Sequence, residues 1–184
     1  MVNRYLKNAV FDKDHTYIVH QRNHYHNVPL WAVVKVITFG TLSKMYSVLQ
    51  YPQRNQIVHS FLYASDRQLA NAIDCMTYFR NICAHNERLY SFKLSQRAFP
   101  DTPLHAKLRI PLKGTEYIFG KKDYFALVIA LRYTLPSNEF LVYKRSLKKL
   151  IDDYTKDNAL FPKSDLLHTM GFPSNWETMT RYRP

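Results

Sequence analysis

Glycine is scarce in this sequence, with 4 in 184 residues, whereas there are 14 tyrosines and 11 phenylalanines. A turn-rich β fold needs many glycines, because glycine enters tight turns with positive φ at little steric cost. The shortage therefore argues against such a fold and favours helices packed through aromatic side chains. Hydrophobic residues make up 46% of the chain, which is enough to bury one core at this length.

Cysteine is scarce as well, and its two positions exclude a local disulfide. Cys75 and Cys83 lack the C-x-x-C spacing and lie in one expected helix. At the helical rise their Cα atoms would be about 12 Å apart, which is beyond the reach of a disulfide bond. We therefore expect two small buried apolar side chains in a reducing compartment.

Long apolar runs are missing. The longest, "VPLWAVVKVITFG" over residues 28–40, is interrupted by Lys35 and is too short to cross a bilayer. The first residues, "MVNRYLKNAVFDKD", contain no apolar stretch of the kind that a secretory signal needs. We expect a cytoplasmic protein that makes no contact with a membrane.

Acidic residues number 14 against 26 lysines and arginines, which gives a formal net charge of +12. Such an excess favours a polyanionic partner, because each neutralised phosphate releases counterions. Within "KRSLKK", Lys144 and Lys148, and likewise Arg145 and Lys149, stand at i, i+4 spacing and can form a face that contacts RNA. The alternatives are that this run is a solvated helix face and that the net charge serves solubility alone.

Apolar residues recur at helical spacing along most of the chain, so the sequence predicts an all-α fold. From Pro29, a residue suited to a first helical turn, this spacing continues to Gly40, where we expect a kink or a tight join. A break at "YPQ", residues 51–53, follows. Further helices are expected over Arg54–Tyr63, from an N-cap at Ser65, over Lys122–Tyr133 and over Ser137–Tyr154.

Two segments lack a helical pattern. Residues 95–121 contain three prolines and two glycines, which predicts a long irregular loop that can hold a short extended segment. The tail "LLHTMGFPSNW" is apolar, and we expect it to be irregular and to dock on the helices. Residues 1–184 are expected to form a single domain, a helical bundle around one core.

The helix expected from Ser65 has a clear start signal. Ser65 is a suitable N-cap, and Gln68 three residues later completes the capping-box pattern. An apolar stripe then follows one face of the helix, formed by Leu69, Ala72, Ile73, Met76 and Cys83.

Polar residues interrupt this helix in the segment "YFRNICAHNERLY", which holds Arg80, Asn81 and His85. On an ideal helix Arg80 falls about 20° from Leu69, in the centre of the apolar stripe. A guanidinium stays charged, and burying it without a partner would cost several kcal/mol. We therefore expect the stripe to open into a cleft at Arg80 or to meet a partner surface there. The alternative is a structural role, with a buried Arg80 capping carbonyl groups and His85 at the helix end.

The spacing of Arg80 and His85 is by itself weak evidence. "RNQIVH", from Arg54 to His59, has the same spacing and the same asparagine. Arg54 follows a break in a short polar stretch, whereas Arg80 lies deep in a capped helix. We expect Arg54 and His59 to lie on an exposed helix without a catalytic role.

Three segments carry a resemblance to a known family: "HYHNVPLWAVVKVITFGTLSKMY", "RNICAHNERLY" and "MGFPSNW". They are similar, in this order, to the proline–tryptophan helix, the R-N-[apolar]-C-A-H-x-x-R-L signature and the closing motif of Abi-like proteins, the AbiD and AbiF type of bacterial abortive-infection proteins. That family is placed in the HEPN superfamily of helical ribonucleases, so the resemblance implies a helical bundle of HEPN type. Family members usually have an additional N-terminal half, which we expect to be absent here, and often a glutamate where this chain has Lys35.

The resemblance implies a metal-independent endoribonuclease without a cofactor, acting in phage defence or as a toxin. Its catalytic residues would be Arg80, Asn81 and His85. The histidine would transfer protons, the arginine would stabilise the phosphorane, and the asparagine would orient the histidine or the phosphate. Because two proton transfers are needed and the motif has one histidine, we expect a homodimer with a composite site.

Other residues beside the motif are candidates for holding RNA. Arg88 matches the family pattern and is expected to make a structural or RNA-backbone contact, while Tyr78 and Tyr90 can stack on bases. A regulatory RNA or an antitoxin is a further candidate partner. The alternative function is a catalytically silent module of HEPN type that binds RNA or dimerises.

The N-terminal region is rich in histidine but not in the other ligands that a metal site needs. No carboxylate or cysteine shares the spacing of the four histidines. We expect no metal site there, and surface side chains or RNA contacts at His15, His20, His24 and His26.

Overall fold

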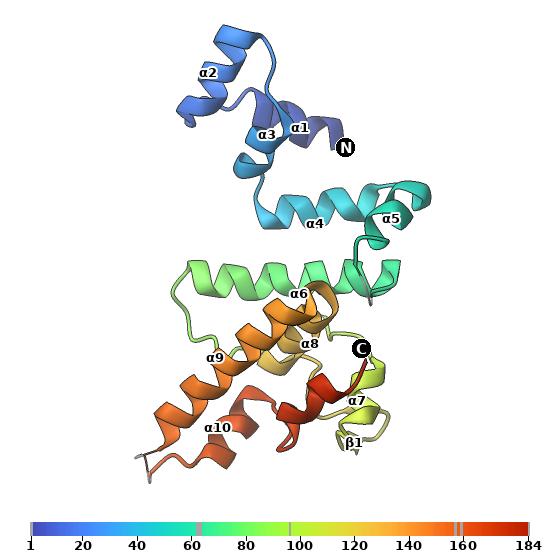
Figure 1. Ribbon diagram of the computed structural model, residues 1–184, viewed down its shortest axis with the longest axis vertical. Helices are drawn as coiled ribbons and strands as arrows, with labels where there is room; N and C mark the ends of the chain where they lie inside the picture. The colour runs from blue at the N-terminus through green and yellow to red at the C-terminus, as the bar shows by residue number, and fades with distance from the viewer. Residues whose placement is uncertain (1, 62–63, 96, 157, 159, 184) are drawn as a thin grey trace. The chain divides into compact units, whose positions relative to one another are not determined.

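The computed structural model (Figure 1) describes residues 2–61, 64–95, 97–156, 158 and 160–183. The protein is 63% helical with one small two-stranded sheet, so the predicted all-α fold is confirmed. We expected one domain over residues 1–184. That stays a prediction. The contacts within the chain form two compact units, Met1–Arg54 and Asn55–Pro184, and each is described by itself.

The first unit contains four helices and the start of a fifth. They are α1 (Val2–Val10), α2 (Thr16–Tyr25), α3 (Leu30–Val36), α4 (Phe39–Val48) and α5 (Tyr51–Val58), which continues into the second unit. Arg22 closes the turn between α1 and α2 by donating to the carbonyls of Val10 (3.0 Å) and Asp12 (3.1 Å). The core is small, formed by Ala9, Ile18, Ala32, Val33 and Tyr46.

The breaks between these helices differ from the predicted ones. The join expected at Gly40 lies at Ile37 and Thr38, because the Thr38 hydroxyl accepts a hydrogen bond from the Thr41 backbone N–H (3.1 Å) and caps α4. The break expected at residues 51–53 is wrong, since α5 begins at Tyr51 and its proline lies in the first turn, where no N–H is needed. The helix predicted to reach Tyr63 ends at Val58, and residues 62–63 lie outside the described part of the chain.

The second unit holds the candidate site. Its elements are α6 (Asp66–Ala84), α7 (Pro103–Lys107), β1 (Leu112–Lys113), β2 (Glu116–Tyr117), α8 (Tyr124–Thr134), α9 (Ser137–Thr155), α10 (Lys163–Met170) and the 3-10 helix η1 (Trp176–Arg181). The capping box at the start of α6 is confirmed. The Ser65 hydroxyl accepts from the Gln68 N–H (3.3 Å), and the Ser65 N–H donates to Gln68 Oε1 (2.9 Å).

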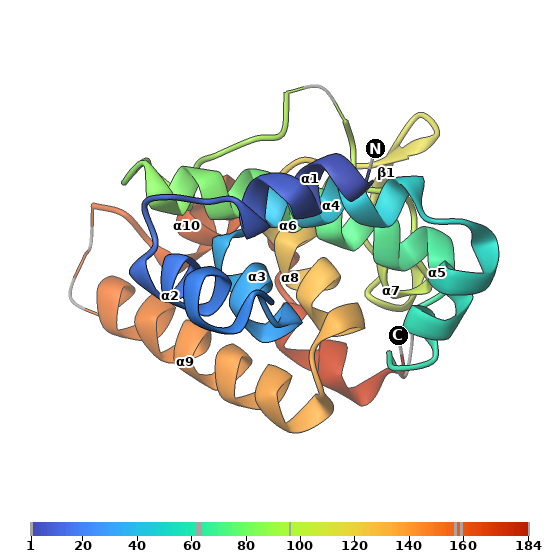
Figure 2. The same ribbon diagram turned by 90° about the horizontal axis from the view of Figure 1, so that it is seen from above.

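The core of this unit forms around α8, which packs along α6 (Figures 1 and 2). Phe125, Val128 and Ile129 of α8 are fully buried, as is Phe79 of α6. A helix that is apolar on nearly all sides must be enclosed by other elements. The predicted ranges of α8 and α9 are confirmed to within two residues at each end.

The predicted irregular loop at residues 95–121 is wrong in part. Thr102 precedes Pro103, which suits a first helical turn, and α7 forms there. The expected extended segment is confirmed as the hairpin β1–β2. Both ends of the connection before α7 are fixed, because the backbone N–H groups of Leu94 and Phe99 donate to the carbonyls of Lys122 and Lys121, each at 2.6 Å.

The tail is more regular than predicted, because it forms α10 and η1. Gly171 ends α10 with a φ of 76°, a conformation that glycine adopts readily. The expectation that the tail docks on the helices is confirmed, since Met170, Phe172 and Trp176 belong to the core of the second unit.

Candidate functional site

Helix α6 positions the motif, but its buried face differs from the predicted stripe. The buried side chains are Leu69, Ala72, Cys75, Phe79 and Ile82. This face is centred close to Phe79, which lies 100° from Arg80 on the helix. The prediction that Arg80 lies in the centre of a buried stripe is therefore wrong, and Arg80 is exposed. The physical reason is that α8 packs against a different side of α6 from the one that Ile73, Met76 and Cys83 suggested.

Which of the two cysteines is buried follows from the face of α6 that α8 covers. Cys75 is buried, as expected, and desolvation raises the pKa of its thiol to about 12, with the charges of Asp74 and Asp123 acting in the same direction. Cys83 is exposed, so its predicted burial is wrong. Both thiols are free, which confirms that they form no disulfide.

The end of α6 fixes the position of His85. His85 is the C-cap residue, and Asn86 follows with a φ of 56°. The N–H of Glu87 donates to the carbonyl of Ile82 (3.0 Å) and that of Asn86 to the carbonyl of Cys83 (3.2 Å). These two bonds form a Schellman motif, which stops a helix at a defined residue, here with asparagine in the left-handed position.

Asn81 links the other two motif residues. Its side-chain oxygen Oδ1 accepts a hydrogen bond from Arg80 Nη1 (3.3 Å), and its backbone carbonyl accepts from the His85 N–H (3.0 Å). Arg80, Asn81 and His85 are all exposed. The alternative of a buried Arg80 that caps carbonyl groups is therefore wrong, whereas the position of His85 at the helix end is confirmed.

The second segment with the same spacing has a different structure. His59 is exposed, as expected, and lies just after the end of α5. Its ring Nε2 lies 3.5 Å from Asn55 Nδ2, so here the asparagine side chain faces the histidine instead of the arginine. Arg54 is half-buried, which differs from the exposure that we expected.

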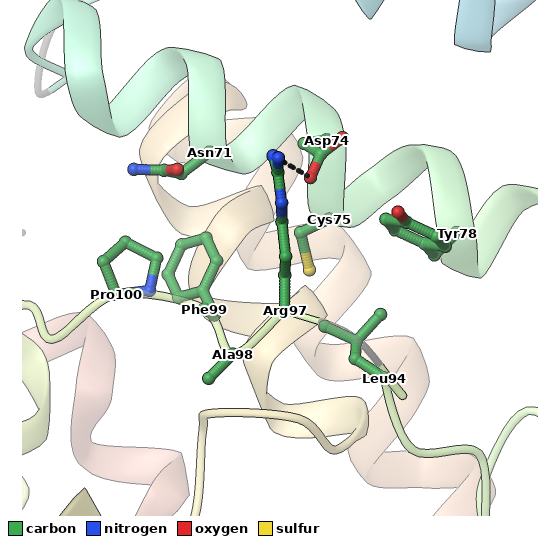
Figure 3. Close-up of a pocket in the computed structure, with 9 residues that line it drawn as sticks. All are labelled: Asn71, Asp74, Cys75, Tyr78, Leu94, Arg97, Ala98, Phe99 and Pro100. Carbon is green, nitrogen blue, oxygen red and sulfur yellow. Dashed lines mark ion pairs between the residues drawn. The ribbon is translucent and has the colours of Figure 1, made fainter.

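Tyr78 and Tyr90 line different hollows, so the structure does not bring these two RNA-binding candidates together. Figure 3 shows Tyr78 beside Cys75 in a small cleft between α6 and the side chains of residues 94 and 97–100. Arg97 crosses this cleft and pairs with Asp74 at 3.8 Å. Tyr90 lines a larger groove at the other end of the motif. Arg88 is exposed, and in the sequence it lies between His85 and the groove-lining residue Leu89.

The cationic run on α9 divides into two pairs. Arg145 and Lys149 are exposed, as an RNA-facing surface requires. Lys144 is half-buried and donates to the carbonyl of Glu177 and to the hydroxyl of Thr180 (2.8 Å). Desolvation lowers the pKa of Lys144. Thus Lys144, one member of the pair Lys144 and Lys148, already has partners within the protein.

Lys148, the second member of that pair, belongs to an ion-pair network. It lies 3.5 Å from Glu177 Oε1 and also pairs with Asp152, which in turn binds Lys163. These contacts join α9 to α10 and η1. These ion pairs therefore hold the C-terminal elements α10 and η1 against α9.

In the first unit, Lys35 and the four histidines have the following surroundings. Lys35 Nζ lies 5.3 Å from the centre of the Trp31 ring, a cation–π contact that a glutamate could not make. His20, His24 and His26 are exposed, and His15 pairs with Asp12 at 2.9 Å. Within the described residues, no three histidine, cysteine or acidic side chains gather in a way that could hold a metal ion.

Two buried polar residues of the second unit were not predicted. Asp123 caps α8 and accepts hydrogen bonds from the N–H groups of Gly120 (3.0 Å) and Ala126 (3.2 Å). Desolvation raises its pKa to about 6, against the opposing effects of Lys93 and the backbone donors. His105 is fully buried between Thr102 and Gly120, and desolvation lowers its pKa. The aspartate directly before the apolar run "YFALVIAL" was an available signal.

No helix among the described residues is both long and apolar enough to cross a membrane. In the comparison with known families, the model described as "Abi-like protein" matches residues 1–91. The matched part contains the helices α3 and α4 and the motif at the end of α6, whereas "MGFPSNW" lies outside it. No curated protein and no solved structure matches the chain.

Proposed function

Because the first half of this chain, residues 1–91, belongs to the Abi-like protein family, we propose that the protein is a metal-independent endoribonuclease of HEPN type. It acts in abortive infection, the phage-defence role that the family suggests, or as a toxin. One structural observation supports the nuclease. Arg80, Asn81 and His85 are exposed together at the fixed end of a helix whose other face is buried. Exposed polar groups on a rigid support are what a reactive site requires.

The chemistry of the motif suits attack by the 2′-hydroxyl of RNA on the adjacent phosphate. The 2′-oxygen forms a bond to phosphorus, the bond from phosphorus to the 5′-oxygen breaks, and a 2′,3′-cyclic phosphate and a 5′-hydroxyl result. A base removes the 2′-proton and an acid protonates the departing 5′-oxygen. His85 can serve in either step, because histidine titrates near neutral pH.

Arg80 supplies the charge that this reaction needs. Its guanidinium offers several N–H donors to the non-bridging oxygens, which gain negative charge in the transition state. The bond from Arg80 to Asn81 Oδ1 holds the guanidinium on the same side of the helix end as Asn81. Asn81 does not titrate, so its part is to orient His85 or the phosphate, and its side chain also accepts a bond from Arg80.

A homodimer with a composite site remains part of the proposal. The support is chemical, since each motif has one histidine and the reaction needs an acid and a base. An exposed Arg80 is also free to meet a partner surface, which is one of the two arrangements that the sequence predicts for it. Two copies related by a two-fold axis would bring two histidines to one phosphate.

Cleavage of RNA in EDTA tests the nuclease. The wild type is compared with His85→Ala, Arg80→Ala and His59→Ala, where His59 is an exposed histidine with the same sequence spacing from an arginine. We expect His85→Ala to lose cleavage by about 100-fold or more, the usual contribution of a general acid or base. His59→Ala should cleave like the wild type. Equal cleavage by His85→Ala and the wild type would exclude the proposed mechanism.

Mixing the wild type with His85→Ala tests the composite site. If each site needs a histidine from both copies, the activity at fixed total protein follows the square of the wild-type fraction. An equal mixture then retains about a quarter of the activity, whereas independent sites retain about half. Tight, salt-sensitive RNA binding by a wild type that does not cleave would favour the silent RNA-binding module instead.

A further inference from the structure

An apolar groove opens beside the C-terminal end of the motif. It encloses about 610 Å³, within the range of ligand sites in proteins. Its walls come from the segment after α6, the start of α8, one face of α9 and the inner side of α10, all in the second unit. The groove is thus built by the same unit that holds Arg80 and His85.

Three tyrosines line this groove, and two of them present their rings to solvent. The side chains of Tyr90 and Tyr154 are 43% and 59% exposed, whereas Tyr124 is buried and its hydroxyl lies 3.1 Å from that of Tyr143. Exposed aromatic rings on an apolar wall can stack on a flat ligand, because stacking removes their apolar surface from water. Such rings are the usual platform for unpaired bases.

The charges in and beside the groove suit the base and the phosphate of a nucleotide at different places. Among the described residues that line the groove, Asp153 is the one charged side chain, and a carboxylate repels phosphate but accepts hydrogen bonds from the amino groups of bases. One cation is adjacent in sequence instead: Arg88 is exposed and directly precedes the lining residue Leu89. An apolar interior with a cation next to its lining fits a base inside and a phosphate outside.

The groove is also close enough to the motif to hold part of the same RNA. Leu89 follows His85 by four residues, so their Cα atoms lie no more than about 14 Å apart. A short single-stranded segment spans that distance. From the lining, the charges and this proximity, we infer that the groove binds an unpaired base of the RNA whose backbone is cleaved at Arg80 and His85. This inference rests on the proposed function for its ligand, and its test measures binding only.

The test uses the full chain carrying His85→Ala, so that RNA stays intact. Its affinity for a short single-stranded RNA is measured by fluorescence anisotropy in EDTA, and again for the same RNA with one base removed at each position in turn. We expect removal of one particular base to weaken binding about tenfold, the effect of one lost stacking contact.

Adding Tyr154→Ala locates that effect. The exposed Tyr154 ring can be removed without opening the core, and unfolding curves of the variants check this. With Tyr154→Ala the intact RNA should bind about tenfold more weakly, and removal of the critical base should have no further effect. Tyr51→Ala, which removes a similarly exposed ring (65%) from the first unit, should leave the base effect unchanged.

The outcomes separate this inference from the proposed nuclease. The inference is overturned if the base effect persists in Tyr154→Ala, or if it is absent in the His85→Ala protein. An apolar segment of a protein partner would then be the ligand to test in the groove. Cleavage by the wild type can still be present in that case. A base effect that requires Tyr154, in a protein that never cleaves RNA, supports the groove and excludes the nuclease.

Discussion

Gly171 and Asp123 lie so close together that a Cβ atom on Gly171 would stand 2.1 Å from the carboxyl carbon of Asp123. Gly171 ends α10 and Asp123 begins α8, so this contact joins two helix ends that are distant in sequence. It gives a physical reason for the glycine in "MGFPSNW". Only a residue without a side chain leaves room for the buried carboxylate.

Replacing Gly171 by alanine should therefore destabilise the protein. The new methyl group collides with Asp123 and also meets a φ of 76°, so we expect the free energy of unfolding to fall by about 2–4 kcal/mol. Gly114→Ala is the matched control, because Gly114 has a similar φ of 64° but open space around it. It should cost only about 1 kcal/mol. Denaturant unfolding of both variants measures the difference, and equal losses would show that the contact with Asp123 is unimportant.

The pKa of Asp123 predicts how stability depends on pH. Burial raises this pKa from 3.8 to about 6, so the folded protein holds the proton over a pH range in which the unfolded chain has released it. Stability should then fall as the pH rises from about 4 to about 7, by an amount on the order of 3 kcal/mol from this group. Asp123→Asn has no proton to lose.

The measurement is the difference in unfolding free energy between the wild type and Asp123→Asn at several pH values. This difference isolates Asp123, because His105 and the exposed groups titrate alike in both proteins. We expect the wild type to lose stability relative to Asp123→Asn as the pH increases from 4 to 7. A difference that is constant over this range would contradict the raised pKa.

Asn86 should control where α6 ends. Its φ of 56° suits glycine and asparagine, whereas a β-branched residue is strained there. Asn86→Val should lower the free energy of unfolding by about 1–2 kcal/mol. It should also reduce RNA cleavage, because His85 loses its fixed place at the C-cap. Asn86→Gly, which adopts the same backbone conformation freely, should retain both stability and cleavage. If the valine and glycine variants behave alike, the Schellman motif does not position His85.

Arg145 and Lys144 should differ in their effect on RNA affinity. Arg145 is exposed, so Arg145→Ala should weaken binding and reduce the dependence of log K on log salt concentration by about 0.7, the value for one phosphate contact on a single strand. Lys144→Ala should instead lower stability by about 1 kcal/mol, because it removes the bonds to Glu177 and Thr180. Salt titrations and unfolding curves of both variants test this. A larger salt effect for Lys144→Ala would reverse the assignment.

The features predicted well from the sequence depend on neighbouring residues. The capping box of Ser65 and Gln68 uses residues three apart, and its signal is complete within one turn of helix. The long apolar run of α8 likewise predicts a buried helix without reference to its partners.

The features predicted wrongly depend on contacts between distant segments. Arg80 was placed on the buried face because the stripe was chosen from α6 alone, whereas α8 decides which side of α6 is covered. The groove lined by Tyr90 and Tyr154 could not be predicted, because it exists only where α9 and α10 approach the segment after α6.

The packing of α6 on α8 has a consequence for the order of events when the chain is synthesised. Residues 85–123 separate the two helices, so α6 leaves the ribosome well before the helix that covers its apolar face. Closing so long a loop makes folding of this unit slow compared with that of a bundle built from adjacent helices. The part of the chain that matches the family model ends before α8 begins. A nascent chain therefore contains the complete motif without a folded support for it, and the motif acquires its fixed geometry only after α8 has emerged.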